Sequence, residues 1–183
     1  MLELSLNILD IAQNSIGAEA KSITVIVEYS GHEDALFIVV SDDGRGMDQE
    51  LLKKVTDPFF TTRTTRSVGL GVPFFKMAAE MAGGEFNITS EPGKGTTTTA
   101  KFVYSHIDRA PLGNLAESMG QLICLNESVE IRFIFRADGK EFIASTGELA
   151  ATLDGLPLNT PQVMQFVCEY IKENMDDVKP DLY

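Results

Sequence analysis

The stretch SITVIVEYSGHEDALFIVVSD, residues 22–42, indicates most clearly how this chain folds. Both of its arms, 22–30 and 35–42, are rich in β-branched residues, which favour strands over helices. Ser30-Gly31-His32 lies between them and supplies residues that suit a turn. We therefore expect a β-hairpin whose second strand ends at Asp42.

Helical patterns and a second hairpin accompany this first hairpin. Residues 2–17 carry apolar side chains at helical spacing and end at a glycine, which favours a helix. The other expected elements are a short helix from Asp48, a helix over about 72–82, and strands over 85–90 and 96–105 joined by a turn at Pro92-Gly93. This order predicts an α+β fold, a two-layer sandwich of a mixed or antiparallel sheet with helices on one face.

The second part of the chain has a different texture. Asp138-Gly139 lies between two strand-like runs and is a strong hairpin signal, and helices are expected over 111–125 and from Thr160-Pro161. The last helix would pack through one face formed by Val163, Phe166, Val167, Tyr170 and Ile171. We divide the chain into 1–104 and a C-terminal α/β extension or small interaction subdomain, 105–183. Whether this second part is a separate domain or an addition to the same sheet stays open.

Composition argues against several functions. Fifteen Lys and Arg against 27 Asp and Glu give a formal net charge of −12, whereas nucleic-acid binding draws much of its affinity from neutralised phosphates. No apolar run approaches the roughly 18 residues of a membrane span, and the acidic N-terminus does not read as a signal peptide, so we expect a cytoplasmic protein. Cys124 and Cys168 lack metal-ligand spacing and are expected to be buried thiols.

The first polar motif is Asp10-Ile-Ala-Gln-Asn14 on the opening helix. Residues four apart share a helix face, so the carboxylate of Asp10 and the carboxamide of Asn14 lie side by side, with Asn7 in the same stripe. Such a pair could polarise a water and ligate Mg²⁺, which prefers oxygen ligands. A solvated helix face is the alternative interpretation.

The second motif, Asp42-Asp43-Gly44-Arg45-Gly46-Met47, follows the end of a predicted strand. A carboxylate at a strand end can accept a hydrogen bond from an amine such as that of adenine, a bond worth roughly 1.5–3 kcal/mol. Gly44 and Gly46 would let the backbone approach a flat ring closely. A tight glycine turn is the alternative.

The third motif is Asp57-Pro-Phe-Phe-Thr-Thr-Arg63. Its two phenylalanines could anchor a loop whose Thr61, Thr62 and Arg63 reach phosphates, or they could simply belong to the core.

The fourth motif, Gly69-Leu70-Gly71, directly precedes a predicted helix. The free amides and the dipole of a helix start bind phosphate without a lysine, which suits an acidic protein. Alone the motif is weak, because it lacks the full dinucleotide-binding and P-loop patterns.

The succession of these motifs over residues 4–104 resembles the GHKL superfamily of ATPases and kinases. There an Asn-bearing helix, an Asp-x-Gly-x-Gly box, a Phe-bearing box, a Gly-x-Gly box and a Gly-Thr strand follow one another, the last here being Gly93-Lys-Gly-Thr-Thr97. The resemblance implies ATP and Mg²⁺ as ligands. By position it implies that Asn14 ligates Mg²⁺, that Asp42, supported by Thr97, binds the adenine amine, and that Gly44 and Gly46 leave space for the purine. It also implies that Gly69-Leu70-Gly71 bind the phosphates. A lid over 61–68 would include Thr61, Thr62 and Arg63.

Two features depart from the family pattern. Asp10 stands where the ATP-hydrolysing and serine-kinase branches usually carry Glu, and it is one methylene shorter. A general base must come within about 2.6–3.2 Å of its proton, so whether Asp10 acts as a base stays open. His32 and His106 are the only histidines, and neither lies on a helix ahead of the ATP domain. We therefore expect no phosphoacceptor histidine domain, and surface or capping roles for both.

Three functions stay open. The chain could be a phosphotransferase that passes the γ-phosphoryl group to a partner protein, an ATPase with Asp10 as base, or a non-enzymatic ATP-dependent interaction module with 105–183 as its partner surface. The short lid favours the first. The whole chain, including Tyr104-Ser-His-Ile-Asp-Arg-Ala-Pro-Leu-Gly113, also resembles standalone ATP-binding proteins often encoded beside iron-only hydrogenase subunits, which implies a partner linked to hydrogenase or redox regulation.

Overall fold

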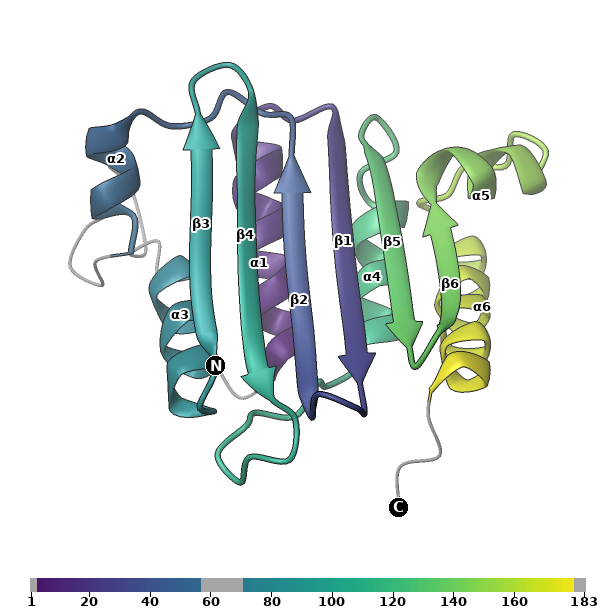
Figure 1. Cartoon of the computed structure of the whole chain (residues 1–183). Coiled ribbons are helices and arrows are strands. Elements are labelled where there is room, and N and C mark those ends of the chain that lie inside the picture. The colour runs from purple at the N-terminus through teal and green to yellow at the C-terminus, as the bar shows by residue number, and fades with distance from the viewer. Residues whose placement is uncertain (1–2, 57–70, 180–183) are drawn as a thin grey trace.

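Strands and helices make up most of residues 3–56 and 71–179, which are the residues that the structure, a computed structural model, describes. The strands are β1 (Ser22–Ser30), β2 (Ala35–Asp42), β3 (Glu85–Glu91), β4 (Gly95–Val103), β5 (Glu130–Ala137) and β6 (Lys140–Ser145). The helices are α1 (Leu4–Gly17), α2 (Gln49–Lys54), α3 (Gly71–Met81), α4 (Leu115–Cys124), α5 (Thr146–Thr152) and α6 (Pro161–Val178). The strands form one sheet in the order β3-β4-β2-β1-β5-β6 (Figure 1).

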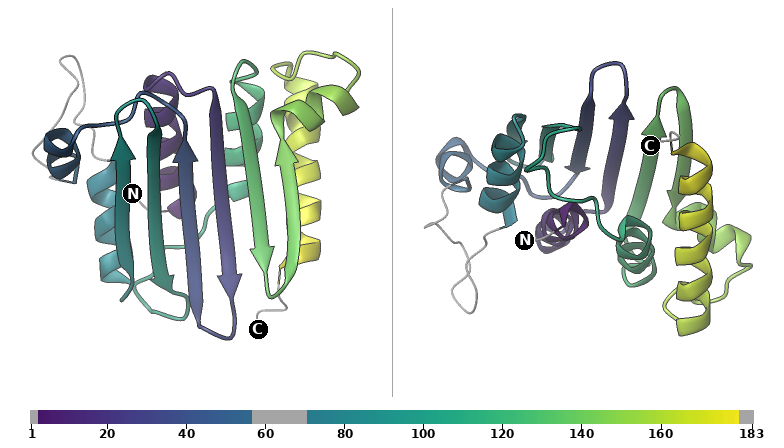
Figure 2. Two further views of the ribbon diagram at one scale, coloured as in Figure 1. Left: turned by 45° about the horizontal axis from the view of Figure 1, so that its top comes forward. Right: turned by 90° about the horizontal axis from the view of Figure 1, so that it is seen from below.

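Strand pairing makes this sheet mixed. β1 pairs antiparallel with β2, and β3 with β4, so both expected hairpins of the first part are confirmed. β5 lies parallel to β1, an arrangement that needs a crossover connection, and α4 lies on that connection. Helices α1, α3, α4 and α6 cover one face of the sheet (Figure 2). The predicted α+β sandwich with helices on one face is confirmed.

The core lies between the sheet and the helix layer. Ile23, Val25 and Val27 of β1 are fully buried, because alternate residues of a strand point to the same face. Leu4 and Ile8 of α1, one helical turn apart, are also fully buried. Burying one such side chain contributes about 1.5–3 kcal/mol. In the described parts of the chain, no helix combines the length and apolar character needed to cross a membrane.

Residues 130–145 extend the sheet of the first part. Ser22–Tyr29 align with Glu130–Ala137 along the whole of β5, and β6 then pairs antiparallel with β5. The hairpin predicted around Asp138-Gly139 is therefore present, and it continues the existing sheet. The functional division of the chain at residue 104 stays a prediction.

The segment before α4 differs from the prediction, because Pro111 does not lie in a helix. α4 begins after its N-cap, Asn114. The carbonyl oxygens of Pro111 and Leu112 instead accept hydrogen bonds from the backbone N–H groups of Leu4 and Ser5, at 2.9 and 3.0 Å. The first amides of a helix have no partner within the helix, so α1 uses this extended segment to satisfy them.

α6 packs through a face that differs partly from the predicted one. Phe166 and Tyr170 were expected to pack, but they are 50 % and 36 % exposed. They lie at the edge of the sheet, where Tyr170 contacts the ring of Phe142 edge-on, with 5.7 Å between ring centroids, and stacks with Phe166. The buried residues of α6 are Val167, Ile171, Met175 and Val178.

The two cysteines differ in burial. Cys124 is buried, as expected, whereas Cys168 is half-buried. Burial raises the pKa of the Cys124 thiol to about 11, and it also raises the pKa of Cys168. A raised pKa leaves little of the reactive thiolate at neutral pH.

We expect iodoacetamide at pH 8 to modify Cys124 in the folded protein at least about 100-fold more slowly than a thiol of ordinary pKa near 8.5. Mass spectrometry of timed samples measures this rate, with urea-unfolded protein as the reference. Equal rates in folded and unfolded protein would contradict the burial of Cys124.

Candidate functional site

Asp42, the last residue of β2, is held by three hydrogen bonds. Its Oδ1 accepts from the backbone N–H groups of Gly44 at 2.9 Å and Thr96 at 3.2 Å, and its Oδ2 accepts from the hydroxyl of Ser15 at 2.6 Å. A carboxylate offers about four acceptor positions on its two oxygens. The described part of the chain therefore leaves one position, on Oδ2, for a ligand that donates a hydrogen bond.

The loop after β2 forms hydrogen bonds with the segment between α1 and β1 and with the β3–β4 turn. Oδ1 of Asp43 accepts from the backbone N–H groups of Ser22 and Lys21 at 2.8 and 2.7 Å, and these bonds, chiefly that of Ser22, lower the pKa of Asp43. The backbone of Arg45 donates to the carbonyl of Ala18 at the end of α1 and accepts from the N–H of Gly93 in the β3–β4 turn. The loop is thus held between α1 and this turn.

Gly44 and Gly46 are required by the packing of the chain itself. Gly46 has a φ of +64°, and a Cβ there would lie 1.9 Å from the carbonyl oxygen of Glu91. A Cβ on Gly44 would lie 2.9 Å from the carbonyl oxygen of Ala18. Both glycines let the loop approach other backbone segments closely. Their role beside a purine stays a prediction.

The polar stripe of α1 divides into a buried and an exposed part. Asn7 is 2 % exposed, and its Nδ2 has no hydrogen-bond partner among the described residues. Asp10 and Asn14 are exposed and lie one turn apart, as predicted. Gly71, the first residue of α3, packs against Asp10, since a Cβ on Gly71 would lie 2.9 Å from the Cβ of Asp10. The start of α3 and the exposed stripe of α1 therefore meet.

α1 contacts both the end of β2 and the start of α3. Ser15 contacts Asp42 near the end of the helix, and Asp10 contacts Gly71 nearer its middle. A helix rises 1.5 Å per residue, so about 7.5 Å of helix separates the two contacts, with Asn14 between them. The contacts with Asp42 and with Gly71 thus both lie along α1, while the binding of adenine at one and of phosphate at the other stays a prediction.

The oxygen donors fit a divalent cation that arrives with an anionic ligand. Within residues 3–56 and 71–179, no three or more His, Cys, Asp or Glu side chains cluster as a metal site would require. Mg²⁺ in phosphate-binding sites commonly takes only one or two protein oxygens and completes its shell with phosphates and water. The exposed carboxamide oxygen of Asn14 suits this arrangement, and the carboxylate of Asp10 lies one turn away.

Thr97 does not support Asp42 as the resemblance implied. Thr97 pairs with Ser41, their hydroxyl oxygens 2.9 Å apart, whereas Thr96 pairs with Asp42. Adjacent residues of a strand point to opposite faces of the sheet, so the hydroxyl of Thr97 lies on the other face from Asp42. The support comes from the backbone of Thr96 and the hydroxyl of Ser15, neither of which was predicted.

Several predicted phosphate-binding residues lie outside the described ranges. These are Thr61, Thr62, Arg63, Gly69 and Leu70. Their roles, and that of the lid over 61–68, stay predictions.

Comparison with known proteins identifies the family. Residues 1–106 match the family described as histidine kinase-, DNA gyrase B- and HSP90-like ATPase. This match covers more than half of the chain's 183 residues and includes Asp10, Asn14, Asp42 and Gly71. The chain therefore belongs to this family, as the GHKL resemblance indicated, and carries its ATP-binding, histidine kinase-like domain.

Several similar proteins are kinases by name, and one of the three that follow is named a histidine-protein kinase. The chain is 36 % identical over 97 residues to the signal transduction histidine-protein kinase AtoS of Escherichia coli, covering 53 % of this chain and 16 % of that protein. It is 36 % identical over 110 residues to the sensor protein kinase FleS of Pseudomonas aeruginosa, covering 60 % and 27 %. It is 35 % identical over 88 residues to sporulation kinase C of Bacillus subtilis, covering 48 % and 20 %. The chain thus spans only a small part of each of these proteins.

A solved structure shares the fold. The N-terminal domain of a DNA repair protein superposes with a TM-score of 0.57 at 15 % sequence identity, covering 78 % of this chain and 52 % of that one. At this identity the similarity concerns the architecture alone.

Proposed function

We propose that the chain binds Mg–ATP between α1, the β2–α2 loop and the start of α3, and that it transfers the γ-phosphoryl group to a partner protein. The observation that carries the binding part is the remaining acceptor position on Asp42, in a carboxylate already fixed by Ser15, Gly44 and Thr96. An adenine amine can donate to this position, whereas the keto oxygen of guanine or hypoxanthine cannot.

The other proposed site residues lie on α1 and at the start of α3, and each has a separate role toward the phosphates or the metal ion. Asn14 would ligate the Mg²⁺ that arrives with the phosphates, and the ion would supply positive charge between the phosphates and the carboxylate of Asp10. The backbone amides and dipole of the α3 N-terminus at Gly71 bind phosphate oxygens. Asp10 takes up the proton of the attacking group, either a hydroxyl of the partner or a water.

The positions of His32 and His106 argue against either of them as the phosphoacceptor of this site. His32 lies in the β1–β2 turn, and seven residues of extended strand, about 24 Å, separate the start of β2 from Asp42. His106 contacts Gly83 just beyond the end of α3, and the twelve residues from Gly71 to Gly83 span about 18 Å at helical rise. Neither histidine is within reach of a phosphate at this site of the same molecule.

The choice among phosphotransferase, ATPase and interaction module is tested with ATP labelled on its γ-phosphate. The native chain, Asp10→Ala and Gln13→Ala are incubated with Mg²⁺, with and without an extract of the native host. Gln13 is also exposed on α1 and serves as the matched control. We expect native protein to label one host protein, and Asp10→Ala to lose at least about 100-fold of this rate with ATP affinity nearly unchanged, as general acid–base catalysis contributes 10²–10⁴.

Other outcomes would identify the alternatives. Free phosphate released by the native chain and lost in Asp10→Ala would make the protein an ATPase. Label that stays on bound ATP, with or without extract, would make it a nucleotide-dependent interaction module. Transfer that survives in Asp10→Ala would remove the proposed role of this carboxylate.

The partner proposal concerns residues 105–183. We propose that this part of the chain presents the partner surface, and that the partner takes part in hydrogenase or redox regulation. The second statement rests on the resemblance of the whole chain to ATP-binding proteins encoded beside iron-only hydrogenase subunits. Because Mg–ATP is the substrate, we place the protein in the cytoplasm, where ATP is made.

A further inference from the structure

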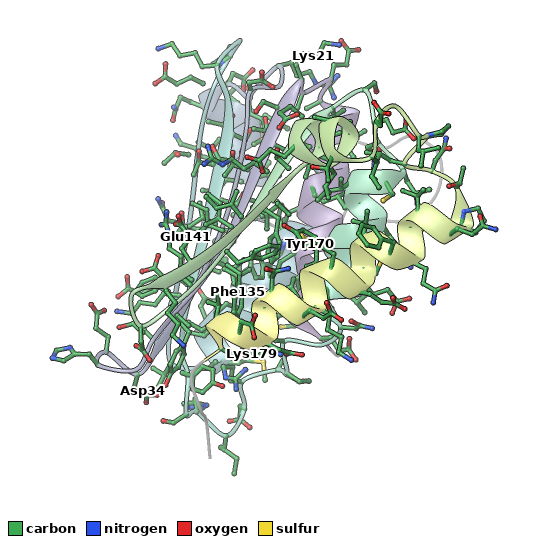
Figure 3. The ribbon with its side chains drawn as sticks, turned by 90° about the vertical axis from the view of Figure 1, so that its right-hand side faces the viewer. Lys21, Asp34, Phe135, Glu141, Tyr170 and Lys179 are labelled. Carbon is green, nitrogen blue, oxygen red and sulfur yellow. The ribbon has the colours of Figure 1, made fainter. Side chains whose placement is uncertain are left out.

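A cavity lies at the end of the sheet away from Asp42. It has a volume of about 620 Å³ and is bounded by the end of β1, the start of β2, the segment after β4, the start of α4 and the end of α6. Figure 3 shows this arrangement from the side of α6: Phe135 and Lys179 lie toward the end that carries Asp34, and Lys21 beside the nucleotide site lies at the other end. Small-molecule sites commonly enclose about 300–1,000 Å³.

Apolar and aromatic side chains form most of the cavity wall. Tyr29 and Tyr104 face each other edge-on with 4.5 Å between ring centroids, and Phe135 of β5 adds a third ring. Leu36 and Ala116 line the sheet side and the helix side. A wall of this kind favours a ligand with an apolar body.

The charged residues described in the cavity wall are all cationic. Arg109, Lys172 and Lys179 line the cavity, and no described acidic residue does, although the chain carries 27 Asp and Glu against 15 Lys and Arg. Lys179 pairs with Asp176 at 2.9 Å, outside the wall. Arg109 and Lys172 form no salt bridge with any described carboxylate. In an acidic protein this cluster marks a local preference for an anion.

Two hydrogen bonds and an aromatic ring fix the position of the Arg109 guanidinium. Its Nε donates to the carbonyl of Tyr104 at 2.6 Å, and its Nη1 donates to the carbonyl of Ala110 at 3.1 Å. The guanidinium lies 4.4 Å from the centroid of the Tyr104 ring. Arginine has five N–H donors, so three have no acceptor in the described part of the chain. A guanidinium fixed in this way loses little freedom when it binds a carboxylate or phosphate.

The segment Tyr104-Ser-His-Ile-Asp-Arg-Ala-Pro-Leu-Gly113 builds much of this site. Tyr104, Arg109, Pro111, Leu112 and Gly113 all line the cavity. The nucleotide-binding motifs of the chain do not contribute to it. The segment therefore forms part of a cavity whose presence the proposed ATP binding does not explain.

We infer that this cavity binds a small amphipathic organic anion, whose apolar body lies against Tyr29, Tyr104 and Phe135 and whose carboxylate or phosphate lies at Arg109 and Lys172. The residues at 172, 175 and 179 share one face of α6, so the two lysines lie on the rim beside the buried Met175. The site is separate from the nucleotide site and does not depend on the proposed phosphotransfer.

The test uses the full chain and the dye 8-anilinonaphthalene-1-sulfonate, an aromatic anion whose fluorescence rises in apolar sites. We expect one dye per chain, displaced by decanoate and not by Mg–ATP. Lys172→Gln should weaken dye binding about 3- to 10-fold, because it removes a charge-assisted contact. Ala116→Phe should weaken it at least about 20-fold, because the new ring occupies the cavity.

Control variants separate this site from surface adsorption and from misfolding. Lys53→Gln on α2 changes the net charge equally and should leave dye binding unchanged. Lys172→Gln and Lys53→Gln should keep the native melting temperature, and all three variants should keep their affinity for Mg–ATP, which shows that Ala116→Phe is folded. Dye binding that survives in both Lys172→Gln and Ala116→Phe would overturn the inference. Displacement by decyltrimethylammonium as effective as by decanoate would also overturn it, since the site would then not select an anion.

Discussion

Replacing Asp42 by asparagine is expected to weaken Mg–ATP binding by about 10- to 150-fold, the equivalent of one hydrogen bond to a charged acceptor worth 1.5–3 kcal/mol. The carboxylate accepts from Ser15, Gly44 and Thr96, and the proposal assigns its remaining acceptor position to the adenine amine. An asparagine has only one acceptor oxygen, so its amide nitrogen would face either these donors or the ligand amine. Isothermal titration calorimetry at constant salt measures the change.

Two comparisons make this test specific. Asp43→Asn removes the neighbouring carboxylate, whose bonds go to the backbone of Lys21 and Ser22 rather than toward a ligand, and ATP affinity should change little. ITP lacks the adenine amine, so native protein should bind it at least about tenfold more weakly than ATP, and Asp42→Asn should lose most of this preference. An ATP affinity unchanged by Asp42→Asn would refute the site assignment.

Gly46→Ala is expected to destabilise the whole protein by about 3–5 kcal/mol. A side chain at its φ of +64° costs about 1–2 kcal/mol, and its Cβ would stand 1.9 Å from the carbonyl oxygen of Glu91, so backbone must move. For a chain of this size we expect the melting temperature to fall by about 6–20 °C. The displaced loop should also weaken Mg–ATP binding. Thermal unfolding with and without nucleotide measures both effects.

Gly93→Ala is the matched control for this variant. Gly93 lies in the β3–β4 turn with a φ of +75°, but a Cβ there would have no neighbour within 4 Å. It should therefore cost only the backbone term, about 1–2 kcal/mol. Equal losses in the two variants would show that the contact with Glu91 does not constrain Gly46.

Local patterns in the sequence predicted the elements around the proposed nucleotide site well. The bounds of β1 and β2 agree with the predicted 22–30 and 35–42, because β-branched runs and a polar turn are local signals. Asp10, Asn14 and Gly71 could likewise be proposed from spacing, and the structure brings Asp10 and Gly71 together. The order of the motifs along the chain supported these proposals more strongly than any single residue did.

Features that depend on register or on distant partners could not be predicted. The sequence offers four successive threonines, and only the pairing of β2 with β4 decides that Thr96 rather than Thr97 lies beside Asp42. Ser15 becomes a donor to Asp42 only through the packing of α1 on the sheet. The short helix α5 and the exposed rings of Phe166 and Tyr170 likewise depend on how the C-terminal hairpin meets the sheet edge.

The parallel pairing of β5 with β1 also matters for the solubility of fragments. β1 is an interior strand only because Glu130–Ala137 occupy one of its sides along eight residue pairs. A fragment that ends at residue 104 would present this side as a long, regular edge with unpaired N–H and C=O groups, carried by a strand of β-branched residues. Such edges recruit other strands, so this fragment should self-associate more strongly than the full chain. By pairing with this side of β1, residues 130–137 thus oppose aggregation through it.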